Sequence, residues 1–150
     1  MDTPALELCN ITCTFRPRSP MEPAYTAVAE TSLRVQPGEF VSVVGPTGCG
    51  KSTLLNVAAG LLTPSLGEVR VFGQVLQGIN ARAGYMFQTE ALMPWRNALD
   101  NVLLGLQYHH TEAQAALQLA MDWLSRVGLS GFEDRYPHQL SGGMRKRVAL

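Results

Sequence analysis

The sequence has little lysine and no excess charge of either sign. Its 150 residues carry 12 basic and 12 acidic side chains, and Lys51 and Lys146 are its only lysines. A balanced charge gives no long-range attraction to nucleic acid or to an anionic lipid surface, so charge indicates neither partner. Because lysine is so scarce, each lysine position is informative.

The sequence also lacks a long apolar run and a secretory leader. No apolar stretch approaches the roughly 20 residues that span a bilayer, and the start carries Asp2 and Glu7 instead of a basic and then apolar segment. We therefore expect a cytosolic protein with reduced thiols, which works at a membrane only through a partner. Cys9 and Cys13 have no second Cys or His pair at zinc spacing, so burial in a strand is favoured over metal binding.

Strand patterns fill the first part of the chain. Apolar alternation and β-branched runs predict strands over residues 5–15, 27–35, 40–44, 67–73 and 83–87. A change of phase near Cys9 and Asn10 predicts a bulge, and residues 36–39 are typical of a tight turn. Residues 40–44 are nearly all apolar, which is typical of a strand buried on both faces. Pro17, Pro20 and Pro23 predict a loop after the first strand.

Helical patterns fill the second half. Apolar periodicity predicts helices over 51–62, 97–108 and 112–127, with Gly128 just beyond the last of these, and another helix beginning after Ser141. Strands that cluster early and helices that follow indicate an α/β protein with a helical portion, rather than alternating βαβ units throughout.

Between the run at 40–44 and the helix at 51–62 lies a glycine-rich loop. Its pattern is G-x-x-x-x-G-K-[ST], a P-loop: glycines let backbone N–H groups approach phosphate oxygens, and the following helix points its positive end at the anion. A lysine here reaches the β- and γ-phosphates of a nucleotide, and a hydroxyl ligates Mg²⁺. For Cys49 a backbone donor role is favoured over a nucleophilic one. The predicted phosphate-binding residues are Gly45, Pro46, Thr47, Gly48, Cys49, Gly50, Lys51, Ser52 and Thr53.

A P-loop alone indicates only a nucleoside triphosphate, since kinases, GTPases, helicases and transport ATPases all carry one. A second anion-binding pattern lies at Ser141, Gly142 and Gly143, where a hydroxyl and exposed N–H groups begin a helix. Taken by itself, Ser141 is as well explained as a helix cap. Two phosphate-type sites in one chain favour the functional interpretation.

Residues 140–144, Leu-Ser-Gly-Gly-Met, resemble the signature motif of the ATP-binding cassette (ABC) ATPases. The resemblance implies a P-loop NTPase of the ABC type, with an N-terminal antiparallel β portion and a helical subdomain at about 89–142. It also implies that Ser141, Gly142 and Gly143 contact the γ-phosphate held by an opposite subunit. Met144 and Lys146 depart from the usual glutamines. Residues 84–88 resemble the family's Q-loop, which implies that Gln88 reaches Mg²⁺ and the attacking water.

The resemblance implies further contacts. An aromatic ring near the N-terminus stacks on adenine in this family; Phe15 fits best, with Tyr25 as the alternative and burial in the core as another role for Phe15. The loop around Pro94 and Trp95, together with residues 131–139, resembles the nitrate/sulfonate/taurine branch of importers. This implies contact with a membrane permease from Leu92 to Asn101, a second ATPase subunit, an indirect solute-binding protein, and a peripheral position on the cytoplasmic face of the inner membrane.

The family's acidic pair, an Asp-Glu that ends an apolar strand after the signature helix, is not found before Leu150. We therefore expect the front part of an ABC domain, cut before the Walker B strand, that holds ATP and Mg²⁺ through Lys51, Ser52 and Gln88 but does not hydrolyse ATP alone. Three interpretations stay open: the ATPase subunit of an importer, a non-transport ABC ATPase acting on nucleic acid, and a fragment that binds without turnover. Neutral charge and the Pro94–Trp95 loop count against nucleic acid. The solute stays open among nitrate, sulfonates and taurine.

Overall fold

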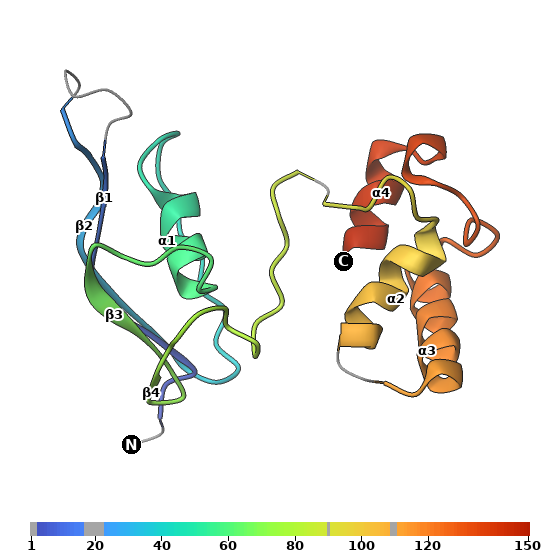
Figure 1. Cartoon of the computed structure of the whole chain (residues 1–150), viewed down its shortest axis with the longest axis horizontal. Helices are drawn as coiled ribbons and strands as arrows, with labels where there is room; N and C mark the ends of the chain where they lie inside the picture. Colours follow the sequence, from blue (N-terminus) through green and yellow to red (C-terminus); the bar gives the residue numbers. More distant parts are fainter. Residues whose placement is uncertain (1–2, 17–22, 90, 109–110) are drawn as a thin grey trace. The chain divides into compact units, whose positions relative to one another are not determined.

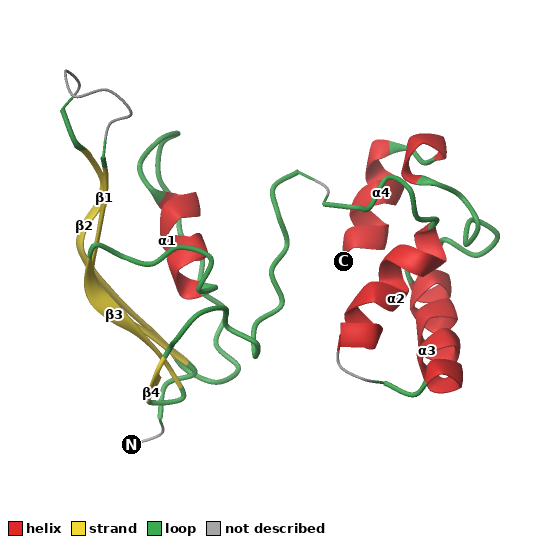
Figure 2. Cartoon of the chain, in the orientation of Figure 1, coloured by secondary structure: helices red, strands yellow, loops and turns green. Residues whose placement is uncertain are grey.

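The computed structural model describes residues 3–16, 23–89, 91–108 and 111–150. Pro17 and Pro20 of the expected loop lie outside the described residues. The chain divides into two compact units, Met1–Tyr85 and Met86–Leu150 (Figure 1). The first unit combines a sheet with one helix, and the described residues of the second contain helices and loops without a strand (Figure 2).

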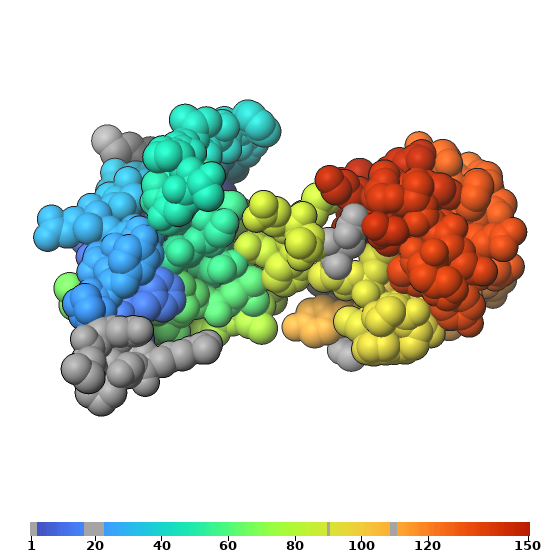
Figure 3. Space-filling model, turned by 90° about the horizontal axis from the view of Figure 1, so that it is seen from above, coloured from blue at the N-terminus to red at the C-terminus, as the bar shows by residue number. Residues whose placement is uncertain are grey.

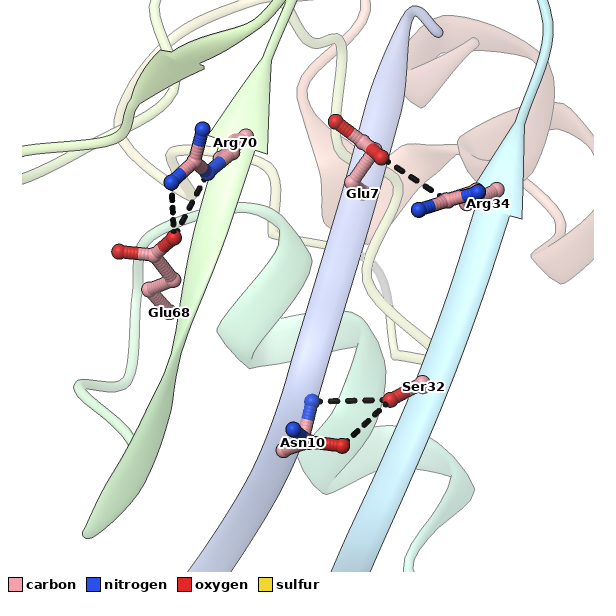
Figure 4. Close-up of polar contacts among 6 residues, drawn as sticks. All are labelled: Glu7, Asn10, Ser32, Arg34, Glu68 and Arg70. Atoms are coloured by element: carbon pink, nitrogen blue, oxygen red, sulfur yellow. Dashed lines mark hydrogen bonds and ion pairs between the residues drawn. The ribbon is translucent and has the colours of Figure 1, made fainter.

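The sheet of the first unit has the order β2-β1-β3-β4 and antiparallel neighbours. Its strands are β1 Leu6–Phe15, β2 Tyr25–Val35, β3 Leu66–Val71 and β4 Gln74–Val75. The predicted bulge is confirmed, because the β1–β2 register shifts between Leu8 and Ile11 and Asn10 has a φ of 51°. There the Asn10 N–H donates to the Ser32 hydroxyl (2.9 Å), which donates back to Asn10 Oδ1 (3.0 Å; Figure 4).

The two faces of this sheet differ in polarity, as the period of two along each strand requires. One face packs against helix α1, Lys51–Ala58, and forms the core with Leu8, Ile11, Cys13, Val28, Leu54, Val57 and Val69. On the other face Glu7 lies in register with Arg34 and Arg70, and its carboxylate contacts Arg34 Nε at 2.9 Å (Figure 4). Burial of Cys13 in a strand is thus confirmed, whereas Cys9 lies in the same strand but is only half-buried.

Two predicted strands are wrong. Residues 40–44 and 83–87 form no ladder with any described strand, whereas the two-residue β4 was not predicted. A strand needs a neighbour that takes up its backbone N–H and C=O groups, and an apolar run indicates burial without supplying that neighbour. Phe40 and Val44 are 93% and 85% exposed. The run instead borders an apolar hollow of about 330 Å³ beside α1.

Helix α1 ends at Ala58, earlier than the predicted end at residue 62. Gly60 takes a left-handed φ of 71°, and a Cβ at this position would collide with the Gly78 carbonyl oxygen. The chain passes so close because the buried Asn80 closes the end of the helix, its N–H donating to Ala59 O at 2.9 Å. Tertiary contact therefore overrides the helical periodicity of the last turn.

The second unit contains α2 Ala98–Tyr108, α3 Ala113–Arg126, the 3₁₀ turn η1 Pro137–Gln139 and α4 Gly142–Ala149. Its separate core consists of Ala98, Leu124, Leu129, Leu140 and Val148. Gly128 follows α3 with a φ of 70°, as predicted, and Arg147 donates to the Val127 carbonyl at 2.9 Å beside it. Among the described residues, no helix combines the length and apolar character needed to cross a bilayer.

Candidate functional site

The P-loop joins the run at 40–44 to α1 and rests against the start of β2. Gly48 and Gly50 have left-handed φ values of 83° and 91°, and Gly50 is the N-cap of α1. A Cβ at Gly50 would collide with the Ala27 carbonyl oxygen and lie 2.9 Å from Val28 Cγ2. Glycine is thus required at this position by the neighbouring strand. The outer side of the loop is open, with residues 42–49 exposed (teal in Figure 3).

Lys51 lies across the loop. Its Nζ donates to Gly45 O at 2.9 Å and to Pro46 O at 2.6 Å, and it lies 3.6 Å from Cys49 Sγ. These contacts tie the ammonium to the loop's own backbone. A fixed positive charge within a glycine-rich turn is suited to a polyphosphate.

The first turn of α1 continues the site. Its first intrahelical bond runs from Leu54 N–H to Gly50 O at 2.9 Å, so the N–H groups of Lys51, Ser52 and Thr53 have no intrahelical acceptor. They add backbone donors and the positive end of the helix to the lysine charge. Cys49 is exposed, and its N–H faces Pro46 O at 3.5 Å. The arrangement offers donors to an anion on the side where Lys51 lies.

Mg²⁺ fits this site only as an ion shared with phosphate. The described part of the chain has no group of three or more His, Cys, Asp or Glu residues that could hold a metal. The exposed Ser52 hydroxyl can supply one oxygen, which suits Mg²⁺, because this ion commonly takes few protein ligands beside water and substrate phosphates. Gln88 is exposed in the second unit, and its part in binding Mg²⁺ stays a prediction.

The signature segment starts helix α4. Ser141 is the N-cap, and its Oγ accepts from the Met144 N–H at 3.3 Å. Gly142 and Gly143 are exposed, and a Cβ on Gly143 would meet no atom within 4 Å. The cap role of Ser141 is confirmed, while its contact with a γ-phosphate stays a prediction. The segment belongs to the second unit, whereas the P-loop belongs to the first.

The two candidate adenine-stacking rings lie together. Phe15 ends β1, Tyr25 begins β2, and they are direct cross-strand partners, 42% and 59% exposed. Neither ring is buried in the core, and which of them stacks on adenine stays open. Sequence reasoning missed one contact: the Tyr25 hydroxyl donates to Gly48 O in the P-loop at 3.3 Å. No local pattern signals a bond between residues 23 positions apart.

The segment from Leu92 to Asn101 is organised by one amide that sequence reasoning also missed. Asn101 Nδ2 donates to the carbonyls of Arg96 (3.0 Å) and Asn97 (2.8 Å), and Asn101 Oδ1 accepts from the Met93 N–H (2.7 Å). The loop held in this way carries Trp95 with 71% of its surface exposed.

Comparison with known proteins identifies the family. The family model described as ABC transporter matches residues 28–150. The chain is 45% identical over 83% of its length to the uncharacterized ABC transporter ATP-binding protein MJ0412 of Methanocaldococcus jannaschii, and 44% identical over 83% to the taurine import ATP-binding protein TauB of Escherichia coli, covering 46% and 49% of those proteins. This chain therefore belongs to the ABC transporter family, and it spans about half the length of these relatives.

A solved structure agrees with this assignment. The dimeric structure of the ATP-binding cassette MJ0796, a post-hydrolysis state bound to ADP and Pi, matches with a TM-score of 0.85 and 32% identity, covering 96% of this chain and 66% of that one. The fold is therefore that of a P-loop NTPase of the ABC ATPase type, with an antiparallel sheet followed by helices, as the sequence predicted.

Proposed function

We propose that this chain is the ATP-binding part of the ATPase subunit of an importer for small anionic solutes of the taurine, sulfonate or nitrate type. The observation that carries the proposal is the Lys51 ammonium held across the P-loop backbone at the start of α1. The 44% identity to a taurine import ATP-binding protein supports the importer branch.

In this proposal ATP is bound with Mg²⁺. Residues 45–53 would hold the phosphates, Lys51 would neutralise charge that develops on the γ-phosphate, and the Ser52 hydroxyl and the Gln88 amide oxygen would be the protein groups that hold Mg²⁺. Phe15 offers its exposed ring to adenine. Mg²⁺ held there would neutralise negative charge on the phosphates.

The proposed partners are a second copy of the chain, a membrane permease and, indirectly, a solute-binding protein. The exposed start of α4 at Ser141, Gly142 and Gly143 suits a phosphate presented by a second copy, and the dimeric structure of a related cassette is consistent with such an arrangement. The exposed Trp95, on a loop fixed by Asn101, suits a pocket of the permease. We place the protein peripherally, at the cytoplasmic face of the inner membrane.

Nucleotide binding is tested with the two lysines of the chain. Lys51→Ala removes a charged donor at the phosphates, so we expect affinity for MgATP to fall about tenfold to a hundredfold in equilibrium titrations. Lys146→Ala, in α4, removes the same charge elsewhere and is the matched control. Equal effects of the two substitutions, or none from Lys51→Ala, would contradict the proposal.

The composite site between two copies is tested by mixing variants. Gly143→Asp places a carboxylate in open space beside the proposed γ-phosphate, so we expect neither it nor Lys51→Ala to form ATP-dependent dimers alone. A mixture of the two forms dimers with one site that keeps both Lys51 and Gly143, so sedimentation velocity should show partial ATP-dependent dimerisation. If the mixture dimerises with ATP no more than either variant does alone, the result counts against a shared site.

A further inference from the structure

The start of β2 contacts the P-loop at two points. Gly50 lies so close to β2 that any Cβ would collide with the Ala27 carbonyl, and the Tyr25 hydroxyl donates to the Gly48 carbonyl at 3.3 Å. Both glycines have left-handed φ values, so the loop turns twice against the same strand. The first contact is steric and only excludes conformations, whereas the second is a directional bond that selects one.

The bond from Tyr25 fixes a peptide plane. In a trans peptide the C=O and the N–H point in opposite directions, so holding the Gly48 carbonyl toward Tyr25 aims the Cys49 N–H to the other side. There the Cys49 N–H faces Pro46 O at 3.5 Å, and the same oxygen accepts from Lys51 Nζ at 2.6 Å. The Tyr25 hydroxyl is thus linked, through a single peptide and a shared acceptor, to the ammonium that would meet the phosphates.

We propose that Tyr25 is a positioning residue for the triphosphate, acting through its hydroxyl on the Gly48–Cys49 peptide. The inference rests on the proposed nucleotide-binding function of the P-loop and adds a residue outside its motif. A loop already held in one conformation loses less conformational entropy on binding, so the hydroxyl raises affinity for the phosphate chain whatever base is attached.

The competing role for Tyr25 is stacking on adenine. Its ring is 59% exposed and lies beside Phe15, so the ring itself is available to a base. The two roles depend on different parts of one side chain. Tyr25→Phe removes the hydroxyl and keeps the ring, whereas Tyr25→Leu removes both.

The experiment measures binding of magnesium tripolyphosphate and of MgATP to the wild-type chain and to both variants. We expect Tyr25→Phe to weaken both ligands by the same factor, about threefold to tenfold, as loss of one hydrogen bond predicts. Ser32→Ala is the matched control, because it removes another hydroxyl of strand β2, one that donates to Asn10 Oδ1 at 3.0 Å and lies outside both the P-loop and residues 84–88. We expect this control to leave both affinities unchanged.

Each other outcome overturns the inference in a recognisable way. Wild-type affinities for Tyr25→Phe, with Tyr25→Leu weakening MgATP alone, would assign the ring to adenine. Equal losses in Tyr25→Phe and Ser32→Ala would indicate a general effect on the stability of the unit. A wild-type chain that binds neither ligand would reject the proposed function itself, whereas normal wild-type binding with an unaffected Tyr25→Phe would reject only the positioning role.

Discussion

At the scale of single residues, the two inner glycines of the P-loop are required for different reasons. Both take a left-handed φ, which costs about 1–2 kcal/mol for other residues. Only Gly50 is also pressed against a neighbouring strand, since a Cβ on Gly48 would meet no atom within 4 Å. Glycine is therefore required at position 48 by the local backbone conformation alone, and at position 50 by tertiary packing as well.

We therefore expect Gly50→Ala to destabilise the first unit more than Gly48→Ala does. Gly48→Ala should cost about 1–2 kcal/mol from backbone strain alone, whereas Gly50→Ala adds overpacking against Ala27 and should cost about 2–5 kcal/mol in total. Denaturant unfolding followed by circular dichroism measures both. Equal losses would show that β2 moves aside and that only the backbone conformation matters.

The motif residues could be predicted from sequence because their chemistry lies within a nine-residue segment, 45–53, of strict spacing. Tyr25 was considered only for its ring. Its bond to Gly48 depends on how the β1–β2 hairpin lies against the loop, and no local pattern encodes that placement. Asn101 was missed for the same reason: an amide in a helix gives no signal of which carbonyls it will reach.

At the scale of elements, helix α3 shows a charged cap. Glu112 is the N-cap residue, and its carboxylate accepts from the N–H groups of Gln114 and Ala115 at 3.0 and 2.9 Å. These backbone hydrogen bonds lower the pKa of Glu112 below its ordinary value. Glu133 is similar, because its own N–H and that of Gly131 lower its pKa.

Acid should therefore weaken the second unit in a way that depends on Glu112. Because the pKa is lower in the folded chain, the unfolded chain binds the proton more readily, and stability falls as pH drops from the ordinary value of 4.5 through the lower folded value. In Glu112→Gln the dependence on pH should be shallower in this window, measured by urea unfolding between pH 6 and 3. Glu133→Gln should remove a further, independent part of the dependence of stability on pH. An unchanged slope in the double variant would refute the assignment.

The loop from Leu92 to Asn101 should lose its order when its organising amide is removed. We expect Asn101→Ala to destabilise the second unit by about 1–3 kcal/mol, because the Met93 N–H and the Arg96 and Asn97 carbonyls lose a partner. In a Trp123→Phe background Trp95 is the only tryptophan. Time-resolved anisotropy should show that Trp95 moves more freely when Asn101→Ala is added to this background. Gln107→Ala, an exposed amide on α2, is the control. Unchanged anisotropy would mean that other contacts hold the loop.

Helices were predicted better than strands for a physical reason. Both ends of α2 and α3 and the start of α4 fall within one residue of expectation, because their caps and periodicity are local. The run at 40–44 was mistaken for a buried strand because apolar composition does not show whether a neighbouring strand pairs with it. Helix α1 ended early because Gly78 and Asn80, about 20 residues onward, close its last turn.

At the scale of the whole molecule, each unit has an apolar core of its own. Leu8, Ile11 and Val57 belong to the core of the first unit, and Leu124 and Leu129 to that of the second. The α/β class followed from sequence, since strands precede helices along the chain. The strand patterns did not predict the division at Tyr85, because the predicted strand at 83–87 would have continued across it, although the resemblance implied a helical subdomain at about 89–142.

The chain carries a natural reporter for each unit. Cys13 is 2% exposed in the first core, and burial raises the pKa of its thiol, so it reacts with a thiol reagent only when that core opens. Both tryptophans, Trp95 and Trp123, lie in the second unit. A Cys9→Ser/Cys49→Ser variant leaves Cys13 as the only thiol.

With these reporters we expect MgATP to stabilise the two units unequally. At a concentration of about 100 Kd, binding at the P-loop should raise the free energy of opening at Cys13 by about 2.7 kcal/mol. Tryptophan fluorescence should show a smaller shift in the second unit, because the P-loop and Lys51 belong to the first. Lys51→Ala should abolish the shift at Cys13. Equal shifts at Cys13 and at the tryptophans would show that bound nucleotide stabilises both cores as one cooperative structure. In that case Gln88 of the second unit is the first residue to replace with alanine.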